Sequence, residues 1–317
     1  MSGPVTSADA PVAEATADTA ASTAQVAGPR LEILPGRQAQ VGTSTVSRVL
    51  PKRAHRTVGA WCFADHFGPA EITDGGVRIG PHPHMGLHTV TWLLDGEVLH
   101  RDSLGSEQLI RPGQLNLMTA GRGVAHAEQT PARTAGTMHG LQLWVAQPES
   151  TRFGDPAFEH HRELPRDEWG DVVATVLVGA LGNASSPARA DTPLLGADLD
   201  ARGAGSIPLD PTFEHALVVA SGALEVDGTM VHPGSLAYLG LGRDELLLGP
   251  ASAGRALLLG GTPFGETVVM WWNFVGRSTD EVDAAYRDWE AKSERFGAVG
   301  SELARVGAPR PNWMPLP

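Results

Sequence analysis

Two pairs of potential metal ligands stand out in the sequence: His82 and His84, on either side of Pro83, and His126 and Glu128, on either side of Ala127. Residues i and i+2 of a β-strand point to the same face of a sheet. Two such strands that meet inside a β-structure could therefore direct three imidazoles and one carboxylate at one interior point. The interval between the pairs is long enough for two or more hairpins to bring them together.

This donor set favours a transition metal. Three nitrogen ligands and one oxygen ligand, without a thiolate, suit Fe(II), Mn(II), Ni(II), Cu(II) or Zn(II) better than Ca(II) or a structural zinc ion. An ion that accepts six ligands would keep two positions for water, dioxygen or a substrate oxygen. The alternative is that each histidine only satisfies a local hydrogen bond, which is the better explanation for any single histidine. Two i, i+2 pairs in one short segment favour the metal site.

The elements that would position these residues are predicted to be strands. Short apolar or alternating runs, broken by Gly, Pro, Asn or Asp, follow one another from about residue 30 onward, and 38 glycines and 24 prolines indicate many turns. The pattern predicts an all-β body. The predicted strands are Leu87–Leu94, Gln108–Ile110, Leu115–Met118, Leu141–Val145, Val172–Val178, Ala216–Ala220, Ser235–Leu239, Glu245–Leu248 and Ala256–Leu259.

A faint internal repeat relates the two halves of this body. Pro112-Gly113, followed by Gly121-Arg122, matches Pro233-Gly234, followed by Gly242-Arg243, at a constant offset of 121 residues. Turn chemistry and flanking apolar positions agree over both stretches, so two copies of one β unit are implied.

The second copy lacks the candidate ligands. Opposite His82, His84, His126 and Glu128 it has Pro208, Asp210, Leu247 and Gly249. A polar requirement of the fold itself would be expected in both copies, so the asymmetry favours a specific site in the first copy.

A length of 317 residues suits two domains. The segment around 149–171 is rich in Pro, Gly and charge, which is typical of a connection between domains. Residues 1–28 contain no Lys or Arg and no continuous apolar stretch, so they resemble neither a signal peptide nor a membrane span. We expect a disordered tail at 1–28, an N-terminal metal-binding domain at 29–150, a linker at 151–171, a metal-free C-terminal domain at 172–275, and a helix and tail at 276–317.

One helix is predicted near the C-terminus. Ser278-Thr279-Asp280-Glu281 has the pattern of a capping box, in which Ser278 accepts from the amide of Glu281 and Glu281 reaches back. Apolar residues then follow at helical spacing through Trp289, and Gly297 stands just past the expected end. The helix is predicted to pack one apolar face on the β body and to have a structural role.

Charge and cysteine content limit the partners. The formal net charge of −12, with no cluster of Lys or Arg, argues against direct binding to nucleic acid, and the sequence gives no sign of membrane binding. Cys62 is the single cysteine and lies in an apolar run, so a buried thiol is expected. A reducing, cytoplasmic location fits this usage.

Three stretches of the sequence resemble the pirin family of bicupins, in the cupin superfamily. They are Gly-Pro-His-Pro-His-Met-Gly at 80–86, Met-Thr-Ala-Gly-Arg-Gly-Val-Ala-His-Ala-Glu at 118–128, and His-Gly-Leu-Gln-Leu-Trp at 139–144, and weaker similarity extends from about residue 30 to 297. The resemblance implies two tandem cupin barrels of the jelly-roll type with the C-terminal helix packed against them.

The same resemblance implies a non-haem iron in the N-terminal cupin, bound by residues matching His82, His84, His126 and Glu128, and a metal-free C-terminal cupin. Fe(II) is therefore the favoured ion, and other divalent transition metals are alternatives. The sequence departs from the general cupin pattern at His88, where a Glu is usual. His88 could be a spare ligand, a hydrogen-bond partner of the ligands or part of the pocket wall, and we favour the last two roles.

The remaining histidines show weaker patterns. His100, with Asp102 nearby, and His139 are expected at turns or at the rim. The others have no partner pattern: His55, His66, His160, His161, His215 and His232.

The family resemblance implies quercetin 2,3-dioxygenase activity, in which a flavonol or similar enolic aromatic ring is opened and carbon monoxide is released. Glu128 would then be both a metal ligand and a general base toward the substrate hydroxyl. Trp61, Phe63 and Trp144 could line an aromatic slot, although core packing is the simpler role for each.

Two other functions are compatible with the family. One is a redox-sensitive regulator that binds a transcription factor or a metabolic enzyme through its iron-containing cupin, by protein contact. The other is a barrel that stores a metal or uses it structurally, without turnover.

Overall fold

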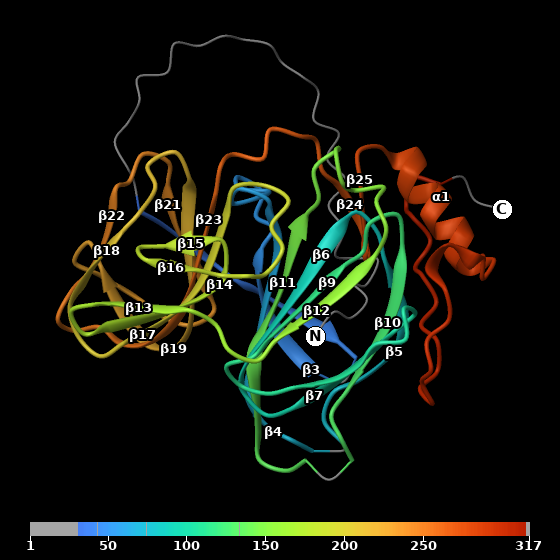
Figure 1. Ribbon diagram of the computed structural model, residues 1–317, viewed down its shortest axis with the longest axis horizontal. Coiled ribbons are helices and arrows are strands. Elements are labelled where there is room, and N and C mark those ends of the chain that lie inside the picture. The colour runs from blue at the N-terminus through green and yellow to red at the C-terminus, as the bar shows by residue number, and fades with distance from the viewer. Residues whose placement is uncertain (1–30, 43, 74, 133, 315–317) are drawn as a thin grey trace.

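The computed structural model describes residues 31–42, 44–73, 75–132 and 134–314. Two antiparallel β units lie side by side in them, and the single α-helix lies at the outer edge of the N-terminal unit (Figure 1). The predicted all-β body is confirmed, and each of the nine predicted strands is part of an observed strand. The tail predicted at 1–28 falls outside the described residues.

The N-terminal unit consists of two sheets. The seven-stranded sheet has the order β12-β9-β6-β11-β4-β3-β2, and the four-stranded sheet has the order β5-β10-β7-β8. The strands are β2 (Arg37–Val41), β3 (Ser44–Leu50), β4 (Trp61–Glu71), β5 (Arg78–His84), β6 (Leu87–Asp95), β7 (Val98–Asp102), β8 (Glu107–Ile110), β9 (Leu115–Thr119), β10 (Val124–Gln129), β11 (Thr137–Ala146) and β12 (Ala157–His161).

The C-terminal unit is built on a ten-stranded sheet with the main order β1-β21-β19-β23-β17-β14-β13, and β18, β20 and β22 pair beside this path. The strands β15 and β16 form a small hairpin, and a second hairpin, β24–β25, packs against the N-terminal unit, where Phe274 bridges to Met85. The strands are β1 (Glu32–Pro35), β13 (Arg166–Trp169), β14 (Val172–Val178), β15 (Ala180–Leu181), β16 (Ala184–Ser185), β17 (Leu194–Ala201), β18 (Gly205–Pro208), β19 (Glu214–Val226), β20 (Thr229–Val231), β21 (Ser235–Gly240), β22 (Glu245–Leu248), β23 (Ala253–Gly261), β24 (Val269–Trp271) and β25 (Phe274–Gly276).

The interior of the C-terminal unit is apolar where the N-terminal unit carries its histidines. Strand β18 pairs with β22 as β5 pairs with β10, and here Ile207, Leu246 and Leu248 are buried in the hydrophobic core. Leu247, which the sequence comparison set opposite His126, is 47% exposed instead. The inward-facing positions are therefore one residue away from those that the repeat indicated.

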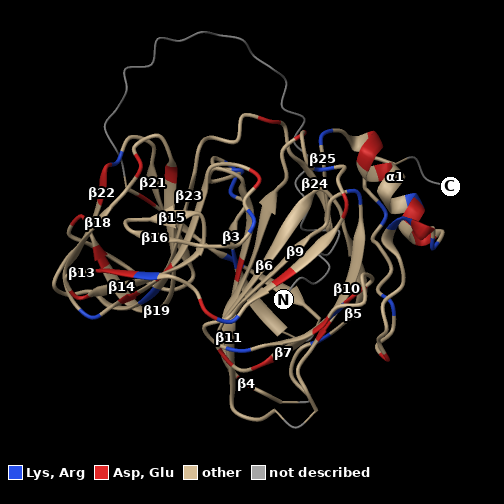
Figure 2. Ribbon diagram, in the orientation of Figure 1, with Lys and Arg blue, Asp and Glu red and all other residues tan. Residues whose placement is uncertain are grey.

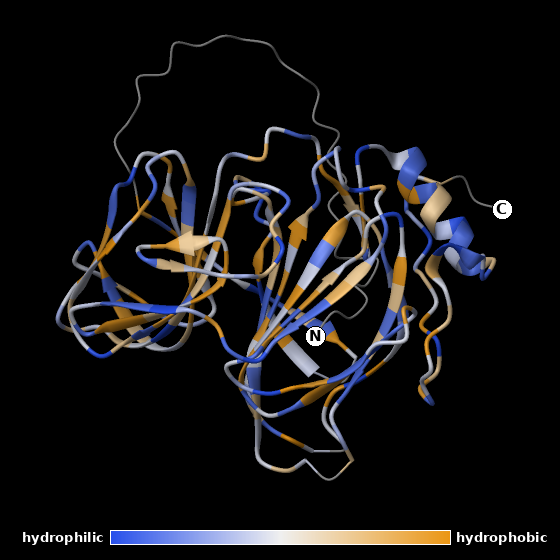
Figure 3. Ribbon diagram, viewed as in Figure 1, coloured by the Kyte–Doolittle hydropathy of each residue, from blue (hydrophilic) through white to orange (hydrophobic). Residues whose placement is uncertain are grey.

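An apolar core joins the two units. Residues on β6, β9 and β11 pack with residues on β19 and β23 in one cluster, which includes Trp92, Leu143, Val218 and Leu257. Hydrophobic positions line the strands of both units, and the surface of the α-helix is largely hydrophilic (Figure 3). This burial of apolar surface holds the two sheets in a fixed arrangement.

The two ends of the chain cross to the opposite units. Strand β1 pairs with β21 of the C-terminal sheet. The helix α1 (Thr279–Glu290) packs with Met85 and Ala125 of the N-terminal unit in a separate hydrophobic cluster. The segment 151–171, expected to link the domains, carries β12, which pairs with β9, and β13, which pairs with β14.

The helix begins as predicted and ends earlier. Ser278 Oγ accepts from the Glu281 amide at 3.3 Å, but Glu281 reaches back to the amide of Arg277 at 2.8 Å and pairs with Arg152. The helix stops at Glu290, and a short 3-10 turn, η2 (Glu294–Phe296), separates it from Gly297.

Residues of opposite charge are interspersed along the described chain. Figure 2 shows Lys and Arg interspersed with Asp and Glu on loops, edge strands and α1. In the described ranges, no helix has both the length and the apolar composition needed to cross a membrane.

A buried histidine pair lies beside the contact between the units. His66 on β4 and His139 on β11 approach to 2.9 Å between their Nε2 atoms, and both are less than 10% exposed. His139 is thus in a strand, and its expected place at a turn or rim is wrong. Burial, followed by the charge of His139, lowers the pKa of His66 to about 4, and burial lowers the pKa of His139.

These pKa values predict acid sensitivity. Because the pKa of His66 is lower in the folded than in the unfolded chain, where it is about 6.5, its contribution is fully present above pH ~6.5 and is lost as pH falls toward ~4. His66→Gln can keep a hydrogen bond to His139 without titrating. Urea unfolding of both proteins over this window should show the wild type losing about 1–3 kcal/mol more than the variant. The exposed His232→Gln is the control, and equal pH slopes for wild type and His66→Gln would contradict the assignment.

Candidate metal centre

Strands β5 and β10 position the three candidate histidines. Their antiparallel pairing puts His82 directly opposite His126, and His84 opposite Val124. Strand β5 lies at the edge of its sheet. Pro81 and Pro83 have no amide hydrogen to donate, which is tolerated at an edge because no strand of the sheet lies on that side to accept one. The alternation of this strand turns His82 and His84 inward together, as predicted from the i, i+2 spacing.

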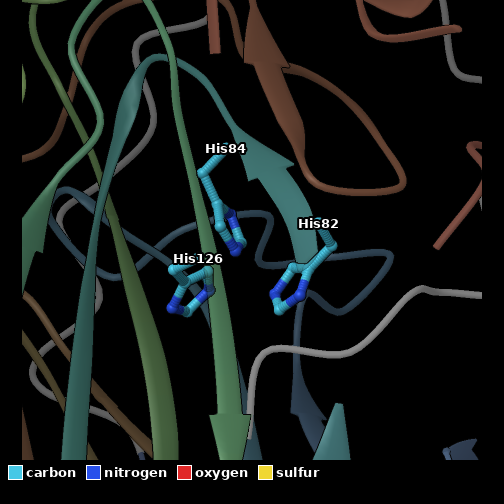
Figure 4. A group of neighbouring side chains, drawn as sticks. All are labelled: His82, His84 and His126. Atoms are coloured by element: carbon cyan, nitrogen blue, oxygen red, sulfur yellow. The ribbon is translucent and has the colours of Figure 1, made fainter. Parts of the chain in front are cut away.

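The three imidazoles converge (Figure 4). One ring nitrogen from each of His82, His84 and His126 lies within 4.8 Å of the others, and all three side chains are fully buried. The ring centroids of His82 and His126 are 4.3 Å apart, those of His84 and His126 are 4.9 Å apart, and those of His82 and His84 are 5.2 Å apart. This is a group that could hold a metal ion.

Glu128 belongs to a neighbouring group that shares His126. The register of β10 against β5 shifts between His126 and Glu128, whereas against β7 it is regular and places Glu128 opposite His100. The candidate ligand atoms of His100, His126 and Glu128 lie within 4.8 Å of one another. The carboxylate is buried beside the histidines, and its charge partly opposes the lowering of the pKa of His82.

The donor atoms fit a divalent cation. Nδ1 of His82 lies 2.9 Å from the Gly80 carbonyl oxygen, which can only accept, so Nδ1 carries the hydrogen and Nε2 the lone pair. Among the described residues, Nε2 of His82 and both ring nitrogens of His84 are buried without a hydrogen bond of ordinary geometry. Unpaired buried nitrogens are costly, and a metal ion would satisfy them.

Burial keeps these histidines in the ligand form. It lowers the pKa of His82 to about 4, and together with the charge of His82 it lowers the pKa of His84 and His126 well below the ordinary value; the backbone of Asn273 partly opposes the change at His84. The imidazoles are therefore neutral at pH 7, which is the state that coordinates a metal.

His100 is a member of the candidate site that the sequence reasoning missed. It was expected at a turn or rim, but it lies on β7 and is 3% exposed. Its Nδ1 is 3.3 Å from Nδ1 of His126, and its Nε2 is 3.2 Å from Oδ2 of Asp102. The spacing of His100 and Asp102 within an alternating stretch was the available signal, since it repeats the i, i+2 pattern of the two ligand pairs.

His88 lies outside both groups. Gly86, with a φ of 71°, ends the strand that carries His84, so the shared face expected from a continuous strand is absent. Nδ1 of His88 is 2.9 Å from Oγ1 of Thr119, and Nε2 is 3.2 Å from Oδ2 of Asp191. The His88 ring therefore connects the N-terminal unit to the segment that leads into β17.

Aromatic side chains flank the histidines. Trp144 meets the His84 ring edge-on at 5.2 Å and stacks on Phe63 at 4.0 Å, and Phe158 stacks on His100 at 4.5 Å. Trp61 points elsewhere, because its Nε1 donates to the carbonyls of Leu195 and Gly260 in the C-terminal unit. Phe63 and Trp144, two of the three aromatic residues proposed from the sequence, therefore lie near the site.

Cys62 contributes no ligand to either group. It is buried as predicted, and burial raises the pKa of its thiol to about 12. The thiol is therefore protonated at neutral pH and is a poor nucleophile and ligand.

Comparisons with known proteins agree with this architecture. The family model "Pirin" matches residues 43–145, and the model "Pirin C-terminal cupin domain" matches residues 194–297. A Pseudomonas aeruginosa protein, named provisionally as a quercetin 2,3-dioxygenase, is 49% identical over 89% of this chain and 91% of its own length. A pirin-like protein of Caulobacter vibrioides is 36% identical over 82% of this chain and 92% of its own length.

A solved structure is also similar. The crystal structure of a quercetin 2,3-dioxygenase from Acinetobacter baumannii has a TM-score of 0.86 and 41% identity, covering 90% of this chain and 97% of its own. The likeness extends over both β units.

The proposed ligand set predicts the metal content of variants. His126→Ala removes the residue common to both groups, so we expect at least a tenfold loss of bound metal, about the lower bound for disturbing such sites. Metal analysis after dialysis against Fe(II) would measure it. His215→Ala is the matched control, because His215 is a fully buried histidine of the C-terminal unit. Equal iron in wild type and His126→Ala would contradict the site.

Proposed function

Because the chain belongs to the pirin family, we propose that it is a metal-dependent dioxygenase of the quercetin 2,3-dioxygenase type, acting on a flavonol or a similar enolic aromatic compound. The observation that carries the proposal is the convergence of three buried imidazoles beside Glu128, with Trp144 against His84. The names of the Pseudomonas and Acinetobacter relatives support the reaction class.

The proposed ligands are His82, His84 and His126, with Glu128 as the carboxylate ligand and Fe(II) as the ion. Neutral imidazoles leave the net charge of the ligand set at −1, so a divalent cation gives a site of low net charge in a buried place. A bound Fe(II) ion would supply a Lewis acid for an enolic hydroxyl and a redox centre for dioxygen chemistry.

Glu128 is the proposed general base. Its carboxylate is 1% exposed and lies within 4.8 Å of the nearest candidate atoms of His126 and His100. A flavonol hydroxyl brought to this position could donate its proton to the carboxylate, and the flavonol would then react as its anion. Burial removes competing water from this transfer.

The aromatic side chains are proposed to orient the substrate. Phe63 and Trp144 form one stacked pair beside His84, and Phe158 lies on the other side, against His100. Planar flavonol rings pack favourably between such faces and edges. The overall reaction adds both atoms of dioxygen to the flavonol, opens its central ring and releases carbon monoxide.

Glu128→Gln tests the general base. The amide is nearly isosteric but cannot take the proton, so turnover of quercetin per bound metal should fall about 10²–10⁴-fold. The protein would be loaded anaerobically with Fe(II), Mn(II), Ni(II), Cu(II) or Zn(II). Loss of flavonol absorbance and release of carbon monoxide would then be followed in air. Dividing the rate by the amount of bound metal separates the loss of a base from the loss of a ligand.

A wild-type protein that binds metal but leaves quercetin unchanged with every ion would contradict the dioxygenase proposal. Capture of a protein partner that depends on the oxidation state of the metal would then favour the regulatory alternative.

A further inference from the structure

We propose that Gln147 is a positioning residue of the candidate metal centre. It holds together the ends of the two strands that carry the histidines, and Asp191, in the segment that leads into β17, orients its side-chain amide. The inference rests on the proposed metal centre and adds two residues to it. Neither Gln147 nor Asp191 is proposed to touch the ion.

Two turns lie at the same end of the pair of ligand strands. Gly86 follows His84 at the end of β5, and Gly121 precedes β10, whose first residue, Val124, lies opposite His84. The Gly86 amide donates to the Gly121 carbonyl at 2.9 Å. A movement of one turn relative to the other would therefore change the distance between His84 and His126.

Gln147 bonds to both turns. Its backbone amide donates to the Gly86 carbonyl at 3.0 Å, and its side-chain Oε1 accepts from the Gly121 amide at 2.8 Å. The residue is fully buried, so these hydrogen bonds form where water does not compete for them. A substitution of Gln147 removes the side-chain contact and leaves the backbone contact in place.

The partners of the Gln147 amide fix its direction. A backbone N–H can only donate, so the atom that faces Gly121 is the oxygen, and Nε2 is directed to the other side. There Nε2 donates to Oδ2 of Asp191 at 3.2 Å and to the Thr151 carbonyl at 3.4 Å. The side chain thus forms a bridge from the Gly121 turn to Asp191.

Asp191 is an ionised acceptor in this bridge. Its carboxylate accepts from the guanidinium of Arg189 at 2.6 and 3.1 Å and from the Thr151 hydroxyl at 2.6 Å, and its side chain is 8% exposed. Burial favours the neutral acid, but the hydrogen bonds with His88, Arg189 and Thr151 outweigh it and hold the pKa of the Asp191 carboxyl well below its usual range. An ionised carboxylate only accepts, so it requires the NH₂ group of Gln147 on its side and turns Oε1 toward Gly121.

The C-terminal unit thereby contributes to a site whose candidate ligands all belong to the N-terminal unit. Asp191 precedes Leu194, the first residue of β17, which pairs with β14 and β23 of the C-terminal sheet. The contact runs from this sheet through Asp191 and Gln147 to the two turns. The metal-free unit is thus proposed to hold the ligand strands at a fixed spacing.

Gln147→Leu tests the bridge with a side chain of similar size. It leaves the Gly121 amide and Oδ2 of Asp191 without this partner, while every candidate ligand is unchanged. We expect the metal affinity of the folded protein, measured by competition with a chelator, to fall about tenfold. The absorption bands of the Co(II)-loaded protein, which report on the arrangement of the ligands, should shift.

Val226→Ala is the control for general stability. Val226 is buried in the hydrophobic core of the C-terminal unit, so its truncation leaves a cavity and lowers the free energy of unfolding. It touches neither turn, and we expect wild-type metal affinity and wild-type Co(II) bands. A loss of affinity in Val226→Ala as large as that in Gln147→Leu would assign the effect to stability and overturn the positioning role.

A double-variant cycle tests the contact between Asp191 and Gln147. In Asp191→Asn the amide at this position no longer supplies two ionised oxygens, so the orientation of Gln147 is weakened and the metal affinity should fall about 3–10-fold. If Asp191 acts through Gln147, the same change made in Gln147→Leu should cost less than about twofold. Equal losses in the two backgrounds would contradict the role given to Asp191.

Hydrogen exchange of the metal-free protein tests the turns directly. The Gly121 amide should exchange about 5–10-fold faster in Gln147→Leu than in the wild type, since it loses one hydrogen bond. The Glu225 amide is the internal control, because it donates to Ser252 Oγ in the C-terminal unit and should be unaffected.

The two readouts separate this inference from the metal centre. Wild-type affinity and Co(II) bands in Gln147→Leu would overturn the positioning role, and so would an unchanged exchange rate at Gly121. A wild-type protein that binds no metal, with faster Gly121 exchange in the variant, would support the bridge between the turns and contradict the proposed metal centre.

Discussion

The antiparallel pairing of β5 with β10 is the constraint on which the rest of the site depends. It sets His82 against His126 in an interior where imidazole cannot be hydrated, so burial lowers the pKa of each histidine and leaves nitrogen lone pairs without solvent. The surrounding residues provide partners for some of these buried nitrogens. The Gly80 carbonyl and His100 contact nitrogens on one side of the histidines, and a cation would satisfy those on the other.

In the C-terminal unit, the corresponding pair of strands has apolar residues in the interior. Strands β18 and β22 meet in the same way, but Ile207, Leu246 and Leu248 fill the interior and join its hydrophobic core. Apolar packing is the less costly solution for a β interior, since no buried nitrogen has to find a partner. The interior between β5 and β10 is therefore polar, and the interior between β18 and β22 is apolar.

Sequence patterns predicted the strands and the histidine convergence because both depend on local alternation. The i, i+2 spacing of His82 and His84 is preserved on β5, and the nine apolar runs are all in strands. The i, i+2 spacing of His100 and Asp102 could have indicated that both lie on one face of a strand. The contact of His100 with His126 and the burial of His139 could not be predicted in this way, since strands distant in sequence decide them. The position of Glu128 depends on a shift in the register of β10 against β5. No Gly or Pro in the sequence between His126 and Glu128 indicates this shift.

The turn at Gly86 is a case in which sequence spacing predicted a neighbour that the structure does not have. A positive φ at this residue ends β5 after His84, and the chain resumes in β6 with His88 pointing toward Asp191. Sequence spacing alone treats the two histidines as neighbours on one strand. Only the backbone conformation separates a candidate ligand from a residue that connects the two units.

The exchange of chain ends has a consequence for synthesis on the ribosome. The outer side of β5 is covered by the last part of the chain: the Val306 amide donates to the Pro81 carbonyl, and a side chain at Gly80 would collide with the Ala304 carbonyl. The N-terminal unit is made first, but β5 acquires this cover only after some two hundred further residues have been translated, a span set by positions 82 and 306. A nascent chain therefore has an uncovered β5 edge beside its histidines until the segment that contains Ala304 and Val306 has been made.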